Sequence, residues 1–313
     1  MMGLRVRIID LNQIRSVLVY PEIISRMRDA LIAQSWGDCE TPMPMHLDIA
    51  AERAEIHMKS SYRRGGKYFA LKIASTFPGN PTRGLSTGNG MMLLSSAQTG
   101  EPVAFLADGG HLTDVRTAAA SAMVARELGR KDDVIGILGT GIQARLQAQM
   151  HAEVLGLCGI WLWGRTRERA LECRRDLETL LPGCEVRVAG SPSEVALHSR
   201  LIVTATASRS PLLFVDDIEP GTHISAVGSD SQGKQELHAE ILRQAALLLV
   251  DSRSQCEKLG ELQHARSERE RAAEIGRFCE APRDWATAGI SVADFTGLGV
   301  EDLYIAEYCY ERV

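Results

Sequence analysis

The chain has 313 residues, which is enough for two domains at about 150 residues each. It is 45% hydrophobic and 24% charged, a composition typical of an ordinary soluble protein that argues against disorder or a fibre. The formal net charge is −5 and there is no basic block, so nucleic acid is not an expected partner. No apolar run reaches the ~18 residues that a membrane span needs.

The seven cysteines are scattered along the chain and form no C-x-x-C pair. This pattern indicates reduced thiols and predicts no metal site. Residues 1–7 lack the apolar core of a signal peptide, so we expect a cytoplasmic protein.

The first ~110 residues predict an antiparallel α+β domain, because one helix is followed by strands with short connections. Apolar residues at helical spacing predict the helix over residues 21–34, and period-two alternation predicts the strands. The predicted strands cover residues 5–9, 54–60, 68–76, 91–96 and 102–107.

Lys72 lies in the strand predicted over residues 68–76, on the face that it shares with Ala70 and Ala74. Small neighbours leave room beside the ammonium group for a ligand. The alternative is a solvated lysine on an exposed sheet face. Polar residues 77–90 follow as a long loop, which could present hydroxyl groups to a ligand or be only a turn.

A second long helix is predicted from an N-cap at Thr113 to Gly129, since these residue types suit the two ends of a helix. Arg116 would then lie in the first turn, where the helix dipole opposes a cation by a few tenths of a kcal/mol. A bound anion nearby would offset this cost, and a surface salt bridge is the alternative.

From Val134 onward the chain alternates between strand and helix patterns. An apolar strand over residues 134–138 leads into Gly139-Thr140-Gly141-Ile142-Gln143-Ala144 and then a helix. This is the order of a dinucleotide-binding βαβ unit, in which a glycine turn and a helix N-terminus bind the pyrophosphate. An ordinary strand–helix turn is the alternative. Further strands over residues 159–163, 185–188, 201–204, 223–228 and 246–251 predict an α/β fold, a Rossmann-type doubly wound parallel sheet.

The second of these strands is followed by Gly164-Arg165-Thr166-Arg167 rather than by a carboxylate. An acidic residue there would bind the ribose of NAD, whereas arginine suits a 2′-phosphate. The sequence therefore predicts NAD(P)(H) as cofactor, with NADP(H) preferred. The strand over 223–228 delivers Asp230 to the same sheet edge, where it could exchange a proton with an amino or imino group or form only an Asx-turn.

The motifs together resemble the ornithine cyclodeaminase/mu-crystallin family. The similarity runs through nearly the whole chain and is most specific in Ala70-Leu71-Lys72, Gly84-Leu85-Ser86-Thr87, residues 112–120, residues 139–144, Thr204-Ala205-Thr206, residues 227–237 and residues 299–303. It implies a discontinuous α+β substrate-binding and dimerisation domain over residues 1–116 and 293–313. A dinucleotide-binding domain would then cover residues 117–292, and the protein would be a homodimer.

The resemblance also implies site residues. Lys72 and Arg116 would bind the substrate carboxylate, and Asp230 would handle protons at the substrate nitrogen. The implied cofactor contacts are Thr87, Arg116, Thr117, Gly139, Thr140, Gly141, Ile142, Gln143, Gly164, Arg165, Thr166, Thr204, Ala205, Val227 and Gly228. Met43 departs from the family, because many members place an arginine just after the proline at this point.

The implied chemistry is hydride transfer at the Cα of a small amino or imino acid. Conversion of L-ornithine to L-proline and ammonia is the specific expectation, which Asp230 favours. An NADPH-dependent ketimine reductase, acting for example on pyrroline-2-carboxylate, or an alanine dehydrogenase-like enzyme is the alternative. Gly164-Arg165 and Met43 favour the reductase. A non-catalytic small-molecule binder of mu-crystallin type is the third possibility.

Overall fold

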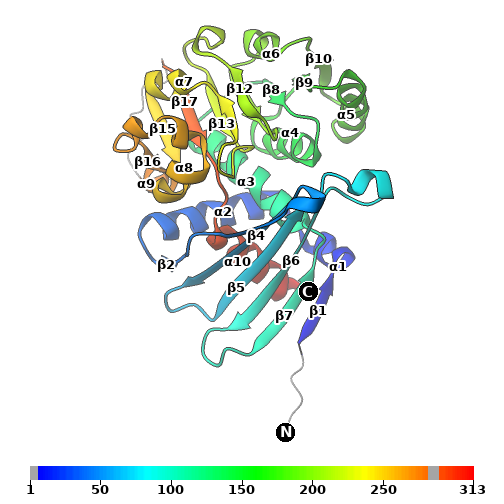
Figure 1. Cartoon of the computed structure of the whole chain (residues 1–313), viewed down its shortest axis with the longest axis vertical. Helices are drawn as coiled ribbons and strands as arrows, with labels where there is room; N and C mark the ends of the chain where they lie inside the picture. Colours follow the sequence, from blue (N-terminus) through cyan, green and yellow to red (C-terminus); the bar gives the residue numbers. More distant parts are fainter. Residues whose placement is uncertain (1–5, 281–288) are drawn as a thin grey trace. The chain divides into compact units, whose positions relative to one another are not determined.

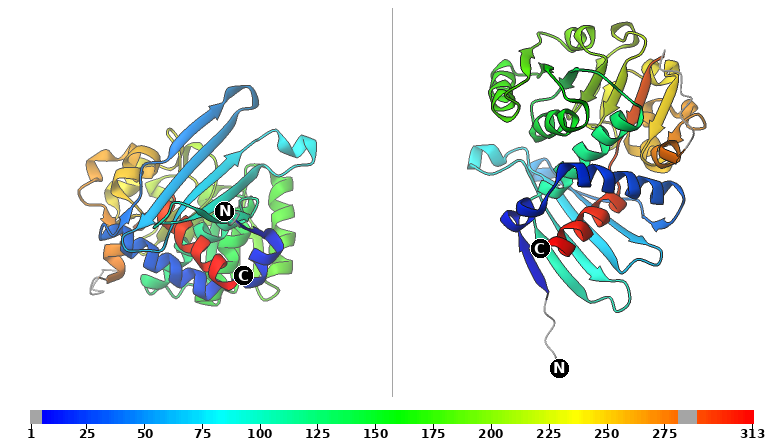
Figure 2. Two further views of the ribbon diagram at one scale, coloured as in Figure 1. Left: turned by 90° about the horizontal axis from the view of Figure 1, so that it is seen from below. Right: turned by 180° about the vertical axis from the view of Figure 1, so that it is seen from behind.

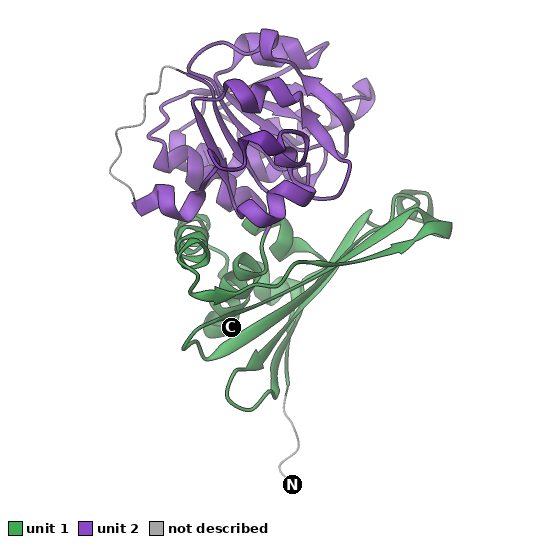
Figure 3. Cartoon of the chain, turned by 60° about the vertical axis from the view of Figure 1, so that its left-hand side comes forward, with its two compact units in different colours: residues 1–116, 298–313 green, residues 117–297 purple. Residues whose placement is uncertain are grey.

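The structure is a computed structural model that describes residues 6–280 and 289–313. The chain divides into two compact units, residues 1–116 with 298–313 and residues 117–297 (Figure 3). The boundary expected at residue 293 falls inside strand β17 (Ser291–Asp294), which pairs with a strand on each side in the sheet of the second unit. The chain therefore returns to the first unit later, at Leu298.

Unit 1 is built on a seven-stranded sheet in the order β1-β7-β6-β5-β4-β2, with β3 paired to β4. All neighbours are antiparallel except β1 and β7. The strands are β1 (Arg7–Asp10), β2 (Cys39–Glu40), β3 (Met45–Ile49), β4 (Ala54–Arg63), β5 (Tyr68–Thr76), β6 (Gly88–Ser96) and β7 (Pro102–Ala107), with short 3-10 turns η1 (Ala50–Glu52) and η2 (Asn80–Arg83) between them.

Helices cover one face of this sheet (Figure 2). Helix α10 (Gly299–Arg312) contacts β4, β5 and β6, and α2 (Tyr20–Ser35) packs against α10. Ile23, Ile24, Met27, Ala30 and Leu31 of α2 are fully buried, so the predicted helical spacing is confirmed. Helix α1 (Leu11–Val17) is short and is closed by a capping box at Asp10.

Helix α3 (His111–Glu127) connects the two units and begins earlier than the sequence predicts. The Asp108 carboxylate accepts a hydrogen bond of 2.8 Å from the backbone N–H of Leu112. Asp108 thus does what the sequence predicted for Thr113, which is to cap the start of this helix. The predicted N-cap at Thr113 is therefore wrong. Arg116 consequently lies in the second turn, where the dipole cost is smaller.

Unit 2 holds a parallel sheet in the order β10-β9-β8-β11-β13-β17-β15-β16 (Figure 1). The six predicted strands are present, so the predicted fold class is confirmed, but β17 lies unpredicted between two of them. The strands are β8 (Val134–Leu138), β9 (Gly159–Trp163), β10 (Glu185–Val188), β11 (Leu201–Thr204), β13 (His223–Ala226), β15 (Leu247–Val250) and β16 (Ala273–Glu274). A separate pair is formed by β12 (Arg209–Leu213) and β14 (Gln235–Leu237).

The helices of unit 2 pack on this sheet. Helices α4 (Ile142–Leu155) and α5 (Arg167–Leu180) contact each other, and α6 (Pro192–His198) contacts β8 and β9. The remaining helical segments are α7 (Ala239–Gln244), α8 (Arg253–Leu259), α9 (Ile275–Glu280), η3 (Val215–Asp217), η4 (Glu261–His264) and η5 (Arg266–Glu268). The charged segment over residues 267–277 forms turns, β16 and the start of α9.

Within the described ranges, no helix combines the length and apolarity that a membrane crossing requires.

Candidate functional site

Lys72 lies on the inner face of β5, beneath the helices of unit 1. Its side chain is 2% exposed, and its Nζ lies 3.0 Å from Oδ1 and 2.9 Å from Oδ2 of Asp302 on α10. Lys72 is therefore not a solvated surface lysine. A lysine is almost never buried to this degree without a partner, and Asp302 is that partner.

Arg116 of α3 reaches the same carboxylate. Its Nε donates to Asp302 Oδ1 at 3.2 Å, and its Nη1 donates to Glu301 Oε2 at 3.3 Å. Glu301 also accepts from the backbone N–H of Leu298, which ties the start of α10 to the cluster. The structure thus brings together Lys72 and Arg116, the two cations singled out in unit 1, through two acidic residues that the sequence reasoning missed.

The electrostatics of the cluster follow from its burial. Desolvation and, to a smaller extent, the charge of Arg116 lower the pKa of Lys72 to about 7, against the opposing attraction of Asp302. Burial opposes ionisation of Asp302, but Lys72 and Arg116 hold its pKa below the usual value. A buried lysine that titrates near neutral pH next to a guanidinium is typical of functional sites.

In unit 2 the two glycines of the turn after β8 differ in the room that they leave for a side chain. Gly139 has φ +131°, its N–H donates to Trp163 O at 2.9 Å, and a Cβ there would lie 2.4 Å from Ala205 O. Gly141 is the N-cap of α4, and a Cβ there would meet nothing within 4 Å. Gly139 is therefore required by the fold, whereas Gly141 leaves the helix N-terminus open.

Two further glycines stand just after strands of the same sheet, with β8 and β11 between those two strands. A Cβ on Gly164 after β9 would lie 2.3 Å from Thr140 Cγ2, and one on Gly228 after β13 would lie 2.2 Å from Thr206 O. Backbone segments therefore approach closely at the carboxyl ends of these strands, which is where dinucleotides bind in such sheets. We call these four residues, Gly139, Gly141, Gly164 and Gly228, the glycine cradle, and around Gly141 alone among them the space is open to 4 Å.

Arg145 supports the turn from within α4 and was not singled out from the sequence. Its Nη1 donates to the carbonyls of Thr140 at 2.9 Å and Gly141 at 3.0 Å, and its Nε donates to Asp176 on α5 at 2.8 Å. No motif marks this arginine, because an Arg on a helix surface is ordinary.

Arg165, directly after Gly164, is exposed. Thr166 occupies the N-cap position of α5, but its side chain makes no capping hydrogen bond. The segment therefore presents an arginine and a hydroxyl near a helix N-terminus, a combination suited to a phosphate group.

Asp230 lies in the loop between β13 and β14, and its side chain is 43% exposed. Its Oδ1 accepts from Lys234 Nζ at 2.6 Å and from Ser231 Oγ at 3.1 Å. Gln263 and His264 of η4 hold this loop by its backbone, through Gly233 N and Lys234 O. The carboxylate is thus accessible on an anchored loop. Lys234, its ion-pair partner, was not identified from the sequence.

The remaining residues that the resemblance implies as cofactor contacts differ in their exposure and in their hydrogen bonds. Thr204 is fully buried and its hydroxyl donates to Glu236 at 2.7 Å, so that hydroxyl is already engaged. Thr87 is exposed at the start of β6, and its carbonyl accepts from Phe77 N. Thr117, Gln143 and Ala205 are half-buried, Ile142 is exposed and Val227 is buried.

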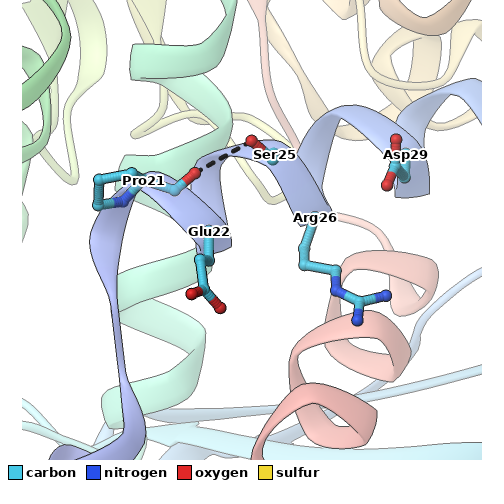
Figure 4. Close-up of a pocket in the computed structure, with 5 residues that line it drawn as sticks. All are labelled: Pro21, Glu22, Ser25, Arg26 and Asp29. Atoms are coloured by element: carbon cyan, nitrogen blue, oxygen red, sulfur yellow. Dashed lines mark hydrogen bonds between the residues drawn. The ribbon is translucent and has the colours of Figure 1, made fainter.

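A hollow of about 380 Å³ lies along α2 (Figure 4). It is lined by Pro21, Glu22, Ser25, Arg26 and Asp29. Glu22 already accepts from Tyr308 and Arg312 of α10, so we assign no ligand to it. Within residues 6–280 and 289–313, no group of His, Cys, Asp and Glu has the arrangement of a metal site.

The parallel sheet with a glycine cradle places unit 2 among dinucleotide-binding α/β folds. A model of the ornithine cyclodeaminase/mu-crystallin family matches residues 7–313, and the chain belongs to this family. The resemblance suspected from the motifs is therefore confirmed.

Two relatives illustrate the range of the family. The chain is 36% identical to an uncharacterized cyclodeaminase of Sinorhizobium fredii, over 87% of this chain and 84% of that protein. It is 30% identical to an alanine dehydrogenase of Archaeoglobus fulgidus, over 97% and 94% of the two chains.

Solved structures show the same fold. An archaeal alanine dehydrogenase dimer with bound NAD superposes with a TM-score of 0.87 at 28% identity, covering 98% of this chain and 95% of that chain. The Δ1-pyrroline-2-carboxylate reductase of Thermococcus litoralis, in complex with NADH and L-proline, gives a TM-score of 0.89 at 25% identity, covering 98% and 97%.

Proposed function

We propose that the protein is an NAD(P)-dependent enzyme that transfers hydride at the Cα of a small amino or imino acid. The observation that carries this proposal is the convergence of Lys72 and Arg116, both buried, on one carboxylate within unit 1. Cations that are held ready in a low-dielectric site bind a carboxylate more strongly than solvated ones. The family membership and the glycine cradle of unit 2 support the same reading.

Lys72 and Arg116 would bind the substrate carboxylate. Arg116 presents a planar guanidinium that suits bidentate contact, whereas Lys72 contributes a point charge. Fixing the carboxylate also fixes the orientation of Cα, and orientation of this kind contributes several kcal/mol to a rate.

The turn residues Gly139–Gln143 and the ends of β9, β11 and β13 would hold the cofactor. The bound nicotinamide would donate or accept the hydride. We propose NADP(H) as the preferred form, because Arg165 and Thr166 follow β9 where an NAD site carries an acidic residue. Dissociation constants for NADPH and NADH at fixed salt, with Arg165→Ala as the variant, test this preference. Tighter NADH binding by the wild type would contradict it.

Asp230 would exchange a proton at the substrate nitrogen or at a water molecule. Its exposed carboxylate on an anchored loop supports this role, because a substrate or a water molecule can approach it within hydrogen-bond distance. Asp230→Asn should lower turnover far more than cofactor affinity. A variant with near-normal turnover would show that the role is misassigned.

The specific reaction that we propose is the conversion of L-ornithine to L-proline and ammonia. Hydride leaves Cα, the δ-amine attacks the resulting imine, ammonia departs, and hydride returns to Cα, so no net oxidation occurs. The accessible Asp230 supports this reaction, since both nitrogens exchange protons along the way. The S. fredii relative, described as a cyclodeaminase, agrees with it.

Reduction of a cyclic imino acid by NADPH is the second candidate. The Arg165 segment favours it, and the chain is 30% identical to a Δ1-pyrroline-2-carboxylate reductase of Bacillus cereus over 97% of its length. An alanine dehydrogenase-like reaction belongs to the same group of net redox reactions. A non-catalytic binder remains the third candidate.

One set of assays separates the candidates. Supply L-ornithine with catalytic NAD⁺ or NADP⁺ and measure proline, ammonia and cofactor absorbance. In parallel, supply pyrroline-2-carboxylate, or pyruvate with ammonium, with NADPH. Proline formed from ornithine without net cofactor change supports the cyclodeaminase, and stoichiometric NADPH oxidation in the second set alone supports a reductase or dehydrogenase. No turnover in any assay contradicts the proposal and favours a binder.

We also propose that the protein is a homodimer that pairs through the outer face of the unit 1 sheet. The strand register places Ile8, Met45, Leu47, Leu71 and Met91 on that face, and each of them is at least 37% exposed. Exposed apolar patches of this kind mark interfaces, and the archaeal relative with the same fold is described as a dimer. Light scattering should give twice the chain mass, and Leu71→Glu with Met91→Glu should give monomers. A monomeric wild type would contradict the proposal.

A further inference from the structure

The loop that carries Asp230 closes through a tight turn over residues 231–234. The backbone N–H of Lys234 donates to Ser231 O at 3.2 Å, and Gly233 has φ +77°, a positive value that glycine adopts most easily at the third position of a turn. The turn brings Lys234 back toward Asp230, so that its Nζ lies 2.6 Å from Asp230 Oδ1. The position of the Asp230 carboxylate therefore depends on the position of this turn.

Gln263 of η4 binds this turn through its side-chain amide. Its Oε1 accepts from the backbone N–H of Gly233 at 2.8 Å. Its Nε2 lies 2.9–3.4 Å from four carbonyl oxygens, those of Ser231 and Lys234 in the turn and those of Leu259 and Gly260 before η4. These partners need a group that both accepts and donates, and an amide does both. One side chain thus ties the turn to η4.

Two more side chains hold the same loop. His264 Nε2 lies 2.8 Å from Lys234 O, and Ser229 Oγ donates to that oxygen at 3.0 Å. Since a carbonyl oxygen can only accept, His264 carries a hydrogen on Nε2. Lys234, whose ammonium group contacts Asp230, is therefore held at its own backbone by η4 and by the start of the loop.

η4 itself is fixed to the sheet of unit 2 by Asp294, the last residue of β17. This carboxylate is fully buried and accepts from the backbone N–H groups of Glu261 and Leu262 at 2.9 Å each. Gly260 makes room for it, because a Cβ there would stand 2.5 Å from Asp294 Oδ2. β17 lies between β13 and β15, so the chain of polar contacts that ends at Asp230 begins inside the sheet.

Proton transfer depends on restraint of this kind. A carboxylate acts on a proton from about 2.6–3.2 Å, and a misplacement of about 1 Å can cost a hundredfold in rate. Loops are more mobile than the strands that they connect, and the side chain of Asp230 is 43% exposed on such a loop. The contacts that hold the loop therefore matter for the reaction, and Gln263 reaches both an N–H group and two carbonyls of the turn.

We propose that Gln263 is a positioning residue, which holds the turn over residues 231–234 and thereby places the Asp230 carboxylate for proton transfer. The inference rests on the proposed role of Asp230 in proton exchange at the substrate. It goes beyond that role by assigning a task in the reaction to η4, which no motif indicates.

The test combines Gln263→Met with Asp230→Asn. Gln263→Met keeps an unbranched side chain but removes the amide. Single-turnover rates of the full-length protein, which stay measurable for slow variants, should fall about ten- to hundredfold, with KM for NADPH within about twofold of the wild type. In the Asp230→Asn background the same substitution should lower the rate by less than about twofold, because residues that act through one another are not additive.

Hydrogen exchange followed by mass spectrometry gives a second measurement that needs no turnover. Exchange of the backbone N–H groups of residues 229–235 should become faster in Gln263→Met. Gln255→Leu is the matched control, because Gln255 is a 3% exposed glutamine of unit 2 whose Nε2 donates to Thr296 Oγ1 at 2.9 Å and to Gly297 O at 2.8 Å. It should leave exchange of residues 229–235 unchanged, and any effect on the rate should be the same with and without Asp230→Asn.

If Gln263→Met does not fold, Gln263→Glu replaces it, since a carboxylate still accepts from Gly233 N–H but cannot donate to the carbonyls. An unchanged rate, an equal loss of rate in both backgrounds, or unchanged exchange of residues 229–235 would overturn the inference while the wild type is active. Failure of the proposed function would appear separately, as a wild type without turnover, and would overturn the inference with it.

Discussion

Buried carboxylates serve the two units in different ways. In unit 1, Asp302 is 1% exposed and its partners are the cations Lys72 and Arg116, which hold its pKa below the usual value. In unit 2, Glu236 is fully buried, and its partners are neutral donors from Thr204, Thr206 and Gly228. Burial raises the pKa of Glu236 despite these hydrogen bonds.

Other carboxylates of unit 2 repeat this pattern at the ends of the strands. Glu261 accepts from the backbone of Glu236 and Leu237, and Asp294 accepts from the backbone of Glu261 and Leu262. Burial raises the pKa of Asp294 to about 7. These acids satisfy the backbone of loops, as buried N–H groups require. Asp302 of unit 1 instead pairs with the cations Lys72 and Arg116 in a buried site, and this difference distinguishes carboxylates that stabilise the fold from the carboxylate of the proposed binding site.

Of the substitutions that test this comparison, Asp302→Asn should lower the free energy of unfolding most. It leaves Lys72 and Arg116 buried without their ionised partner, and loss of one member of a buried ion pair costs about 3–5 kcal/mol. Urea unfolding measures the free energy change. Asp48→Asn, which alters a 69% exposed side chain on β3, is the control and should change stability by less than about 1 kcal/mol. Equal small effects for both variants would contradict the account.

Glu236→Gln should cost less, about 1–3 kcal/mol. The amide keeps one accepting oxygen, but its NH₂ group would face either Gly228 N–H or Thr206 N–H, and no cation is left unpaired. The same urea experiment gives the value. A loss larger than that of Asp302→Asn would show that the charge of Glu236, rather than its hydrogen bonds, stabilises unit 2.

The pH dependence of substrate binding should show whether the Lys72 ammonium group of unit 1 binds the substrate carboxylate. Lys72 binds a carboxylate only when protonated, and burial lowers its pKa to about 7, so KM should rise as pH increases through 7, by up to tenfold per pH unit. Lys72→Arg should show a flatter profile, because arginine stays charged. The ratio of the two profiles cancels the ionisation of the substrate, and a constant ratio between pH 6 and 9 would refute the assignment.

Gly141→Ala tests whether unit 2 binds the cofactor at the turn after β8. A methyl group there meets no protein atom within 4 Å. The loss of unfolded-state entropy on replacing glycine is offset by the poorer N-cap that alanine makes, so the free energy of unfolding should change by less than about 1 kcal/mol. A pyrophosphate at the turn would meet the methyl, so NADPH affinity should fall about tenfold. Gly79→Ala, in a loop of unit 1 that is equally open, is the control. Unchanged NADPH affinity would argue against cofactor binding at this turn.

Sequence reasoning succeeded where a pattern is local. The strand and glycine turn over residues 134–144 and the helical spacing of α2 depend on neighbouring residues, and both are present as predicted. It failed for β17, whose four residues carry no distinct period, and for the start of α3, where Asp108 rather than Thr113 caps the helix.

Only half of the candidate site in unit 1 could be predicted, because the other half depends on contacts between distant parts of the chain. Lys72 and Arg116 were identified, but Asp302 lies 230 residues from Lys72 along the chain. No rule of sequence spacing links positions so far apart. A carboxylate in the first turn of a helix is also common for another reason, because it interacts favourably with the helix dipole.

The most direct test of the central claim follows hydride to Cα. Both proposed reactions contain reduction of a cyclic imino acid, so pyrroline-2-carboxylate is supplied with NADPH deuterated at C4, in separate samples for the two faces of the ring. Mass spectrometry and NMR then locate the label in the product. The account predicts proline with one deuterium at Cα from one of the two samples, lost in parallel with activity in Arg116→Ala. Absence of labelled proline from both samples of active, NADPH-binding protein would contradict it.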